Sequence, residues 1–269
     1  MAEYLRLIRR THVQTSIHHY AHPDTGRRVT VIGTHHVGQP AYFAGLRAVI
    51  DELEAAGAVV HCEGSRLLPC DDPDITAEEQ RLLAELRRCD ELEKQRLSEL
   101  GWVGQMDGLG YPPHWQVIDL SYLEIFRQLG LAAAQQLVQG KTRAFDWPDD
   151  DRKGIDRLRM RITLTLRATA NDRHVTQLEG REPTKTVLLA DRTMLALNGV
   201  AGTDRDTVLV WGVAHMPGLC AGLREQGFVR SDEPQWHTVA ELPSIRTALW
   251  RVVNPASWGG TAARGKRTP

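Results

Sequence analysis

The chain has 269 residues, 33 of them basic and 34 acidic, so its formal net charge is -1. This length suits one large α/β unit or a core with a helical insertion. The balanced charge excludes a global field that would attract nucleic acid or an anionic membrane. We therefore expect a peptide or small-molecule partner and no nucleic acid.

The first ten residues carry charges every few positions and contain no apolar run long enough for a signal peptide. No stretch of the sequence reaches the roughly 18 to 20 apolar residues that span a bilayer. The 4 cysteines have neither Cys-x-x-Cys spacing nor the density of a disulfide scaffold, which indicates reduced thiols. These features predict a cytoplasmic protein without a membrane span.

Residues 1–73 predict the N-terminal half of an α/β core. Two β patterns lead to the turn residues at 22–26, which predict a hairpin. Residues 28–63 then read as strand, helix and strand, with helical apolar spacing over 41–56. We expect a βαβ unit whose two strands are parallel in one sheet.

Residues 74–200 are rich in Leu, Arg, Glu, Gln and Ala and predict a helical insertion or cap. Thr76 begins a capping-box pattern with Glu79. The expected helices cover 76–101, 120–140 with a break near Gly130, 149–169 and 183–198.

The strand pattern returns in residues 201–256, which predict the C-terminal half of the core. The expected elements are a buried strand at 207–212, a helix at 217–226 and strands at 228–229, 235–240 and 245–253. Residues 257–269 predict a disordered tail. The fold class is therefore α/β, with a central mixed, mostly parallel sheet, two strand–Gly-x-x-His–helix units and a large helical insertion between them.

Two Gly-x-x-His motifs, Gly33 to His36 and Gly212 to His215, each close a buried strand, and Glu63 ends a third one. Ligands of open parallel sheets bind outside the carboxyl ends of the strands, so we expect these side chains to meet. Imidazole nitrogen and carboxylate oxygen suit a divalent metal, and three protein ligands leave a position for an activated water. The pattern predicts a metal-dependent hydrolase, with His36, Glu63 and His215 as metal ligands and catalytic residues.

Four further residues are candidates for the site. Arg192 precedes the second motif in a predicted helix, where its guanidinium would hold a substrate carboxylate or a developing oxyanion, unless a surface acid pairs with it. Arg66, Tyr42 and His35 are candidates for substrate binding. Tyr42 is expected near the pocket rim, and His35 alternates to the side opposite His36.

Other catalytic motifs are absent from the sequence. It contains no P-loop, no Gly-x-Gly-x-x-Gly after the first strand and no Gly-x-Ser-x-Gly elbow. Taken singly, each histidine at a strand end is more often a hydrogen-bonded structural residue, so the prediction depends on the whole set.

These motifs resemble the TraB/PrgY/Tiki superfamily, which has two Gly-x-x-His motifs with an intervening Glu and Arg. The matching segments are 31–36, Glu63 with Arg66, 191–194, 212–219 and Gly227-Phe228. The resemblance implies a fold like that of the erythromycin esterase and ChaN-like group. It also implies metal-dependent hydrolysis of a peptide or amide bond, with manganese or cobalt as the activating ion and zinc also compatible. By the same resemblance, His36, Glu63 and His215 are metal ligands or acid/base residues, and Arg192 is a site residue.

The same resemblance leaves two alternatives open, because the superfamily is functionally mixed. One is a non-catalytic binding protein for haem or for a peptide signal. The other is a metal-free, esterase-like hydrolase with a histidine general base, whose activity survives chelators. The chain differs from membrane-attached members in lacking an apolar span, so substrate and location do not transfer.

Overall fold

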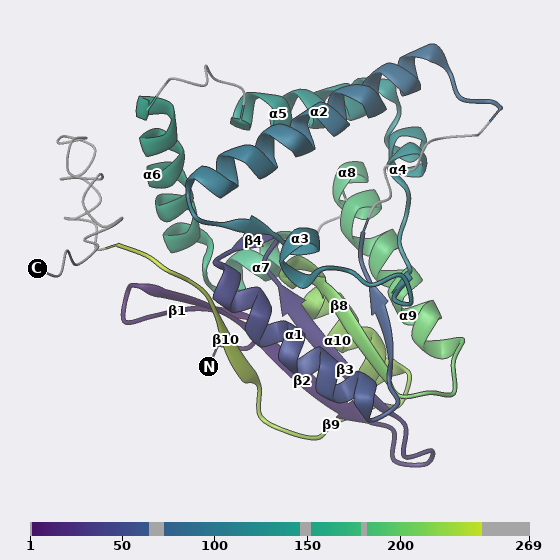
Figure 1. Ribbon diagram of the computed structural model, residues 1–269. Coiled ribbons are helices and arrows are strands. Elements are labelled where there is room, and N and C mark those ends of the chain that lie inside the picture. The colour runs from purple at the N-terminus through teal and green to yellow at the C-terminus, as the bar shows by residue number, and fades with distance from the viewer. Residues whose placement is uncertain (1, 65–72, 146–151, 179–181, 244–269) are drawn as a thin grey trace, which may run out of the picture.

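The computed structural model describes residues 2–64, 73–145, 152–178 and 182–243 (Figure 1). Arg66, the strand expected at 245–253 and the tail at 257–269 lie outside these ranges. Within them the protein is an α/β structure, as predicted, with a sheet, flanking helices and a helical layer above one sheet edge.

Within the described residues, the main sheet has 8 strands in the order β1-β2-β3-β8-β5-β7, and β9 and β10 also pair with β2. The strands are β1 (Leu5–Ile8), β2 (His12–Ala21), β3 (Arg28–Thr34), β5 (Val59–Cys62), β7 (Gln116–Val117), β8 (Thr207–Gly212), β9 (Val229–Arg230) and β10 (Gln235–Glu241). Strand β2 is antiparallel to each of its neighbours, and all other described strands of this sheet run in the opposite direction. The prediction of a mixed, mostly parallel sheet is confirmed.

The βαβ unit is present, with α1 (Pro40–Ala55) between β3 and β5. Its two strands are parallel, but β8 lies between them, because Leu209 pairs with Val31 on one side and with His61 on the other. The carboxyl ends of β3, β8 and β5 therefore lie side by side at one edge of the sheet.

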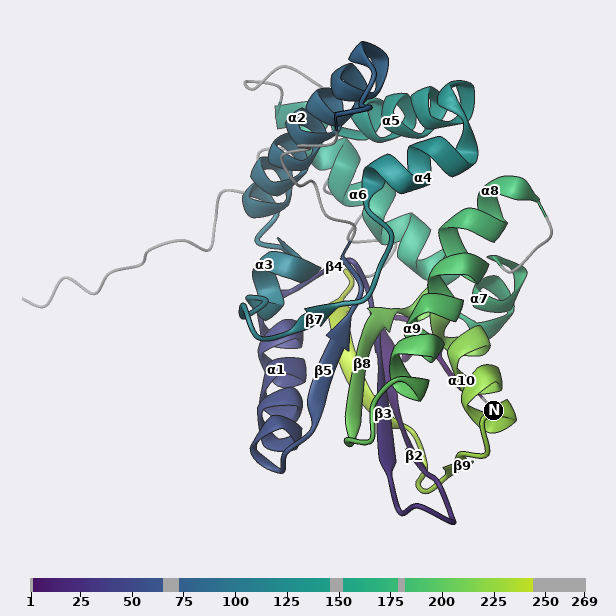
Figure 2. The same ribbon diagram turned by 90° about the vertical axis from the view of Figure 1, so that its right-hand side faces the viewer.

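Helix α1 begins with a proline in its first turn and is followed by Gly57, whose φ of +97° few other residues tolerate. It buries Phe43, Leu46 and Ile50 against the sheet. Helices α9 (Arg192–Ala201) and α10 (Met216–Glu225) cover the opposite face (Figure 2). The core of the sheet is thus closed on both sides, and polar side chains collect at its edge.

The middle of the chain forms the helical layer. Its helices are α2 (Ala77–Glu99), α3 (Gln105–Leu109), α4 (Tyr122–Leu129), α5 (Leu131–Phe145), α6 (Arg152–Thr169), α7 (Asp172–Leu178) and α8 (Pro183–Lys185). Thr76 and Glu79 form the predicted capping box at the start of α2, and Gly130, with a φ of +78°, separates α4 from α5. Leu86, Phe126 and Val138 belong to a second hydrophobic cluster within this layer.

The middle segment also contributes strands that its helical composition does not predict. Strand β7 extends the main sheet by pairing with β5, and β6 (Val103–Gly104) pairs with β4 (Val37–Gly38) in a separate two-stranded sheet. Two-residue strands are too short to show an alternating pattern, so only their partners define them. None of the described helices combines the length and apolarity that crossing a membrane requires.

Candidate active site

Glu63 lies at the centre of the carboxyl-terminal sheet edge, immediately after β5, and is 3% exposed. Its Oε1 is 3.7 Å from Nδ1 of His36, and its Oε2 is 3.8 Å from Nε2 of His215. Nη2 of Arg192 is 3.5 Å from the same Oε2. The structure thus brings four sequence-predicted site residues around one buried carboxylate.

The two Gly-x-x-His motifs pack against each other through their glycines. Because β3 and β8 are parallel neighbours, Thr34 pairs with Gly212. A Cβ on Gly212 would lie 3.2 Å from Nε2 of His36, and a Cβ on Gly33 would lie 3.1 Å from Sδ of Met216. Gly212 thus leaves space for His36 of the first motif, and Gly33 leaves space for Met216, which directly follows the second motif, so glycine suits both positions.

His215 is a buried imidazole, 3% exposed, in the 3₁₀ turn Val213–His215 between β8 and α10. Its Nδ1 is hydrogen-bonded to the hydroxyl of Thr193 at 2.9 Å, and the Trp211 ring contacts it edge-on. Burial lowers the pKa of His215 to about 4, although the charge of Glu63 opposes this shift. His215 is therefore neutral at pH 7, with Nε2 on the side of Glu63.

His36 differs from His215 in its exposure. Its side chain is 71% exposed, compared with 3% for His215. A single carboxylate thus separates a solvent-accessible imidazole from a buried one, and only His36 is open to a substrate or to bulk water.

Arg192 is held by Asp119, a residue that follows β7 and has a fully buried side chain. Nε and Nη2 of Arg192 donate to the two carboxylate oxygens of Asp119, each at 2.7 Å. Nη1 donates to the carbonyl oxygen of Leu188 at 3.2 Å. The guanidinium is therefore fixed in plane beside Glu63, and the predicted pairing of Arg192 with an acid is found inside the site.

The backbone before Arg192 is a π-helical segment, Thr186–Asp191. Within it the backbone N–H of Arg192 bonds to Leu189, while its side chain reaches the carbonyl of Leu188. π-Helical turns are rare and frequently occur at functional sites. The sequence pattern predicts an uninterrupted α-helix here, because the spacing of apolar residues does not distinguish the hydrogen-bond pattern of a π-helix from that of an α-helix.

Gln105, from α3, brings the helical layer into contact with Glu63. Its Nε2 donates to Oε1 of Glu63 at 3.2 Å and to the hydroxyl of Tyr111 at 2.8 Å, and its Oε1 accepts from Thr34 at 2.7 Å. The backbone N–H of Gln105 also donates to the carbonyl of His36 at 2.8 Å. The helical layer and the motif loop are therefore joined at the site.

The structure places two of the predicted substrate-binding residues away from Glu63. Nδ1 of His35 bonds to the carbonyl of Val37, and burial lowers the pKa of His35 to about 4. Tyr42 is 3% exposed, and its hydroxyl bonds to Thr15 and accepts from the backbone of His35, so it braces the loop rather than lining the rim. Arg66 lies outside the described residues.

Sequence reasoning missed Asp119, Gln105 and Thr193. One signal pointed to Asp119, since Val117-Ile118-Asp119 is an apolar pair followed by an acid, as in the strand that ends in Glu63. The helical composition of the surrounding segment outweighed it. Gln105 and Thr193 carry no local signal, because their roles depend on contacts with distant residues.

The buried part of the site has an unbalanced charge. With His215 neutral, two carboxylates, Glu63 and Asp119, face the guanidinium of Arg192. Oε2 of Glu63 is also buried without a hydrogen-bond partner. A proton or a bound cation on the open side of Glu63 would offset this charge, since an unpaired buried carboxylate is costly.

A divalent cation fits this site by donor type and charge, although the donors are not preassembled. His36, Glu63 and His215 offer two imidazoles and a carboxylate, the ligands that zinc and manganese accept in proteins. Across the described parts of the chain, however, no group of three or more His, Cys, Asp or Glu side chains has the arrangement of a metal site. Binding of a cation here would therefore require some of these side chains to move.

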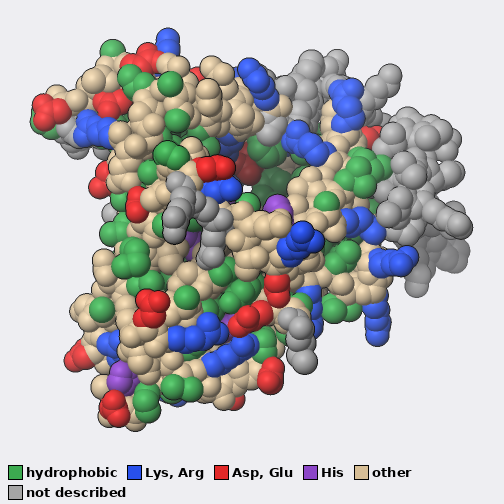
Figure 3. All heavy atoms as spheres, turned by 180° about the vertical axis from the view of Figure 1, so that it is seen from behind, with side chains coloured by type: hydrophobic (Ala, Val, Ile, Leu, Met, Phe, Trp, Pro, Cys, Tyr) green, Lys and Arg blue, Asp and Glu red, His purple; other side chains and the backbone are tan. Residues whose placement is uncertain are grey.

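Figure 3 shows the molecular surface hollowed between the helical layer and the sheet, with basic, acidic and histidine side chains at the margin of the hollow.

Comparison of the chain with protein-family models, curated proteins and solved structures finds no match.

Proposed function

We propose that the protein is a hydrolase of peptide or amide bonds that uses a divalent cation at the edge of its sheet. One observation carries the proposal: the buried carboxylate of Glu63 faces His36, His215 and Arg192 at 3.5 to 3.8 Å, where parallel strands end. Perturbed, convergent ionisable groups of this kind are typical of catalytic sites.

The roles of the residues follow from their exposure and contacts. His36 is the solvent-accessible histidine of the site, and its Nδ1 faces Oε1 of Glu63 at 3.7 Å. Arg192, already planar and fixed by Asp119, stabilises negative charge on the substrate carbonyl oxygen. His36, Glu63 and His215 would hold the cation, which when bound lowers the pKa of water and polarises the carbonyl.

A metal-free hydrolase is the second candidate, and the exposure of His36 favours it. Its Nδ1 lies 3.7 Å from Oε1 of Glu63, while its side chain is 71% exposed. A carboxylate that orients an accessible imidazole is sufficient for general-base catalysis. In this case Glu63 would stabilise the imidazolium that forms when His36 accepts the proton of the attacking water.

The two candidates are separated by assaying a pool of quenched-fluorescent peptides with chelated protein and with protein reloaded with Mn²⁺, together with direct measurement of bound metal. The metal-dependent function predicts hydrolysis that chelation abolishes and Mn²⁺ restores, and that His36→Ala and Glu63→Gln both remove. His114→Ala is the matched control, because His114 forms a comparable surface pair with Glu54 at 2.8 Å.

Hydrolysis that survives chelation would overturn the metal-dependent function in favour of the metal-free one. If neither preparation cleaves any peptide, and added haem or intact peptides bind instead, the site belongs to a binding protein.

A further inference from the structure

Asp119 is the most completely buried charged group of the site, with 0% of its side chain exposed. It comes from the helical middle of the chain, directly after strand β7 has joined the main sheet. Its side chain is enclosed by protein, so its contribution must come through the groups that it touches.

The carboxylate of Asp119 accepts four hydrogen bonds from three residues. The donors are Nε and Nη2 of Arg192 at 2.7 Å, the backbone N–H of Gly64 at 2.9 Å and that of Leu120 at 2.8 Å. Gly64 directly follows Glu63 in the chain. One carboxylate therefore fixes both the guanidinium beside Glu63 and the backbone that carries Glu63.

The bidentate geometry explains why an aspartate is required. A carboxylate matches both donors of the guanidinium fork, and charge-assisted hydrogen bonds are roughly twice as strong as neutral ones. Without this anion, Nη2 of Arg192, which lies 3.5 Å from Oε2 of Glu63, would move closer and hydrogen-bond to that oxygen, which has no hydrogen-bond partner. In such a pair the guanidinium would occupy the carboxylate of Glu63, which His36 and His215 also face.

We infer that Asp119 is a positioning residue of the active site, which keeps Arg192 directed at the substrate oxygen and away from a closed ion pair with Glu63. The inference rests on the proposed hydrolase function. Asp119 adds strand β7 to the site, which the sequence analysis does not assign to it. The helical middle of the chain then supplies a residue that catalysis needs, in addition to covering the sheet.

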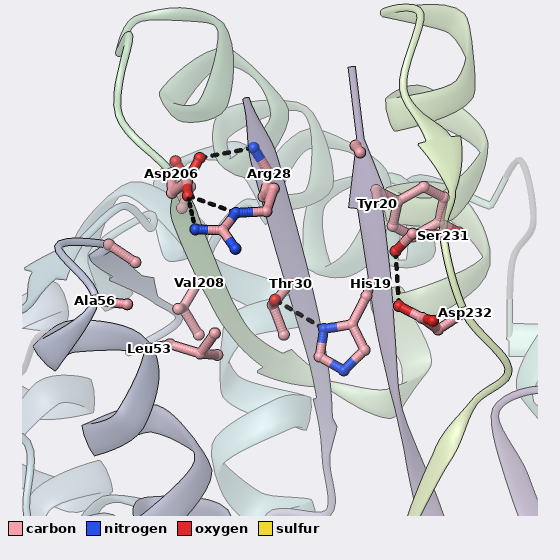
Figure 4. A pocket seen from close by; sticks show the side chains of 13 residues that line it. His19, Tyr20, Arg28, Thr30, Leu53, Ala56, Asp206, Val208, Ser231 and Asp232 are labelled. Carbon is pink, nitrogen blue, oxygen red and sulfur yellow. Dashed lines mark hydrogen bonds and ion pairs between the residues drawn. The ribbon is translucent and has the colours of Figure 1, made fainter. Parts of the chain in front are cut away.

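The chain contains a matched pair for comparison at the other edge of the sheet. Asp206 accepts from Nε of Arg28 at 2.8 Å and from its backbone N–H at 2.7 Å, beside a cavity of about 320 Å³ (Figure 4). The side chains of this pair are 66% and 27% exposed. Asp206→Asn therefore removes an Asp–Arg pair of similar geometry without touching Glu63.

The test compares Asp119→Asn, Asp119→Glu and Asp206→Asn in full-length protein, using the peptide pool with Mn²⁺ and the Arg192 Nε–H signal in nitrogen-15 NMR. For Asp119→Asn we expect kcat to fall about 10- to 100-fold with little change in KM, as for other residues that orient a site. Asp119→Glu should recover part of the loss, and Asp206→Asn should retain wild-type kcat.

The NMR signal of Arg192 tests the positioning role of Asp119 independently of whether the protein is a hydrolase. In Asp119→Asn the Arg192 Nε–H should shift and exchange faster with water, whether or not any peptide is cleaved. Wild-type kcat in a folded Asp119→Asn variant, or an unchanged Arg192 signal, would overturn the positioning role. Absence of hydrolysis in the wild type, with a displaced Arg192 signal in the variant, would overturn the proposed function alone.

Discussion

His36 rests on Gly212, so that the histidine of the first Gly-x-x-His motif covers the glycine of the second. A Cβ at position 212 would lie 3.2 Å from both Cε1 and Nε2 of His36 and 3.1 Å from Oε1 of Glu63. These separations are tighter than ordinary van der Waals contact, so one of the neighbours must move if a side chain is added. The glycine of one motif therefore sets the position of the other motif's histidine.

Gly212→Ala should reduce hydrolysis without unfolding the protein. His36 is exposed and will yield before the buried Glu63, so the imidazole moves away from the carboxylate while the core stays packed. We expect kcat to fall by at least about tenfold, since small displacements of reacting groups are costly. Thermal unfolding and peptide cleavage should be measured together.

Gly140→Ala is the control for this variant. Gly140 lies within α5 with no atom near its added Cβ, so alanine should stabilise the helix by about 0.5 to 1 kcal/mol and leave cleavage unchanged. Full activity of Gly212→Ala would show that the contact between the motifs has no role in catalysis.

Thr193→Val should disturb His215 while keeping the shape of its surroundings. The variant removes the hydroxyl partner of Nδ1 and leaves a buried ring nitrogen unsatisfied, which costs about 1 to 3 kcal/mol of folding stability. It also removes the contact that sets which ring nitrogen carries the proton. Nitrogen-15 NMR of the imidazole should show an altered tautomer ratio, and Thr193→Ser should restore it.

Gly108→Ala should destabilise the contact between α3 and α1. The added Cβ would lie 2.4 Å from Cδ2 of Phe43, a ring that is 0% exposed and has no free space in which to move. Overpacking of this kind costs about 1 to 3 kcal/mol. Urea unfolding should show the loss, and cleavage should fall as well, because α3 carries Gln105 to Glu63.

The stability of the protein should depend on pH through His18, a buried histidine of strand β2. His18 is 0% exposed, and its Nε2 is 2.9 Å from both the Glu3 carbonyl and Oγ of Ser16. Burial lowers its pKa to about 4, against an unfolded value of about 6.5. Between these values the unfolded chain takes up a proton that the folded chain excludes, so the free energy of unfolding falls as the pH decreases.

Between the folded and unfolded pKa values of His18, this one group should change the free energy of unfolding by up to about 1.4 kcal/mol per pH unit. His18→Gln should be less stable than the wild type at pH 7, and the gap should narrow at pH 5. His114→Gln, at an exposed position, should retain the wild-type slope. A constant gap between wild type and His18→Gln at both pH values would contradict the assignment.

The sequence by itself determined the elements whose signals are local. Apolar β-branched runs gave β3, β5 and β8, helical spacing gave α1 and α10, and the Thr76 capping box and Gly130 marked helix boundaries. Strand ends followed by His36, Glu63 and His215 indicated a common edge, because the ends of parallel strands meet.

Only the tertiary structure decided which residues complete the site. The insertion of β8 between β3 and β5 places Gly212 under His36, and the two-residue strand β7 brings Asp119 to Arg192. Tyr42 shows the converse, since its place near the start of the first helix suggested the pocket rim, whereas its hydroxyl contacts Thr15 and the backbone of His35. Strand order and the partners of buried polar groups depend on long-range packing, which no local pattern records.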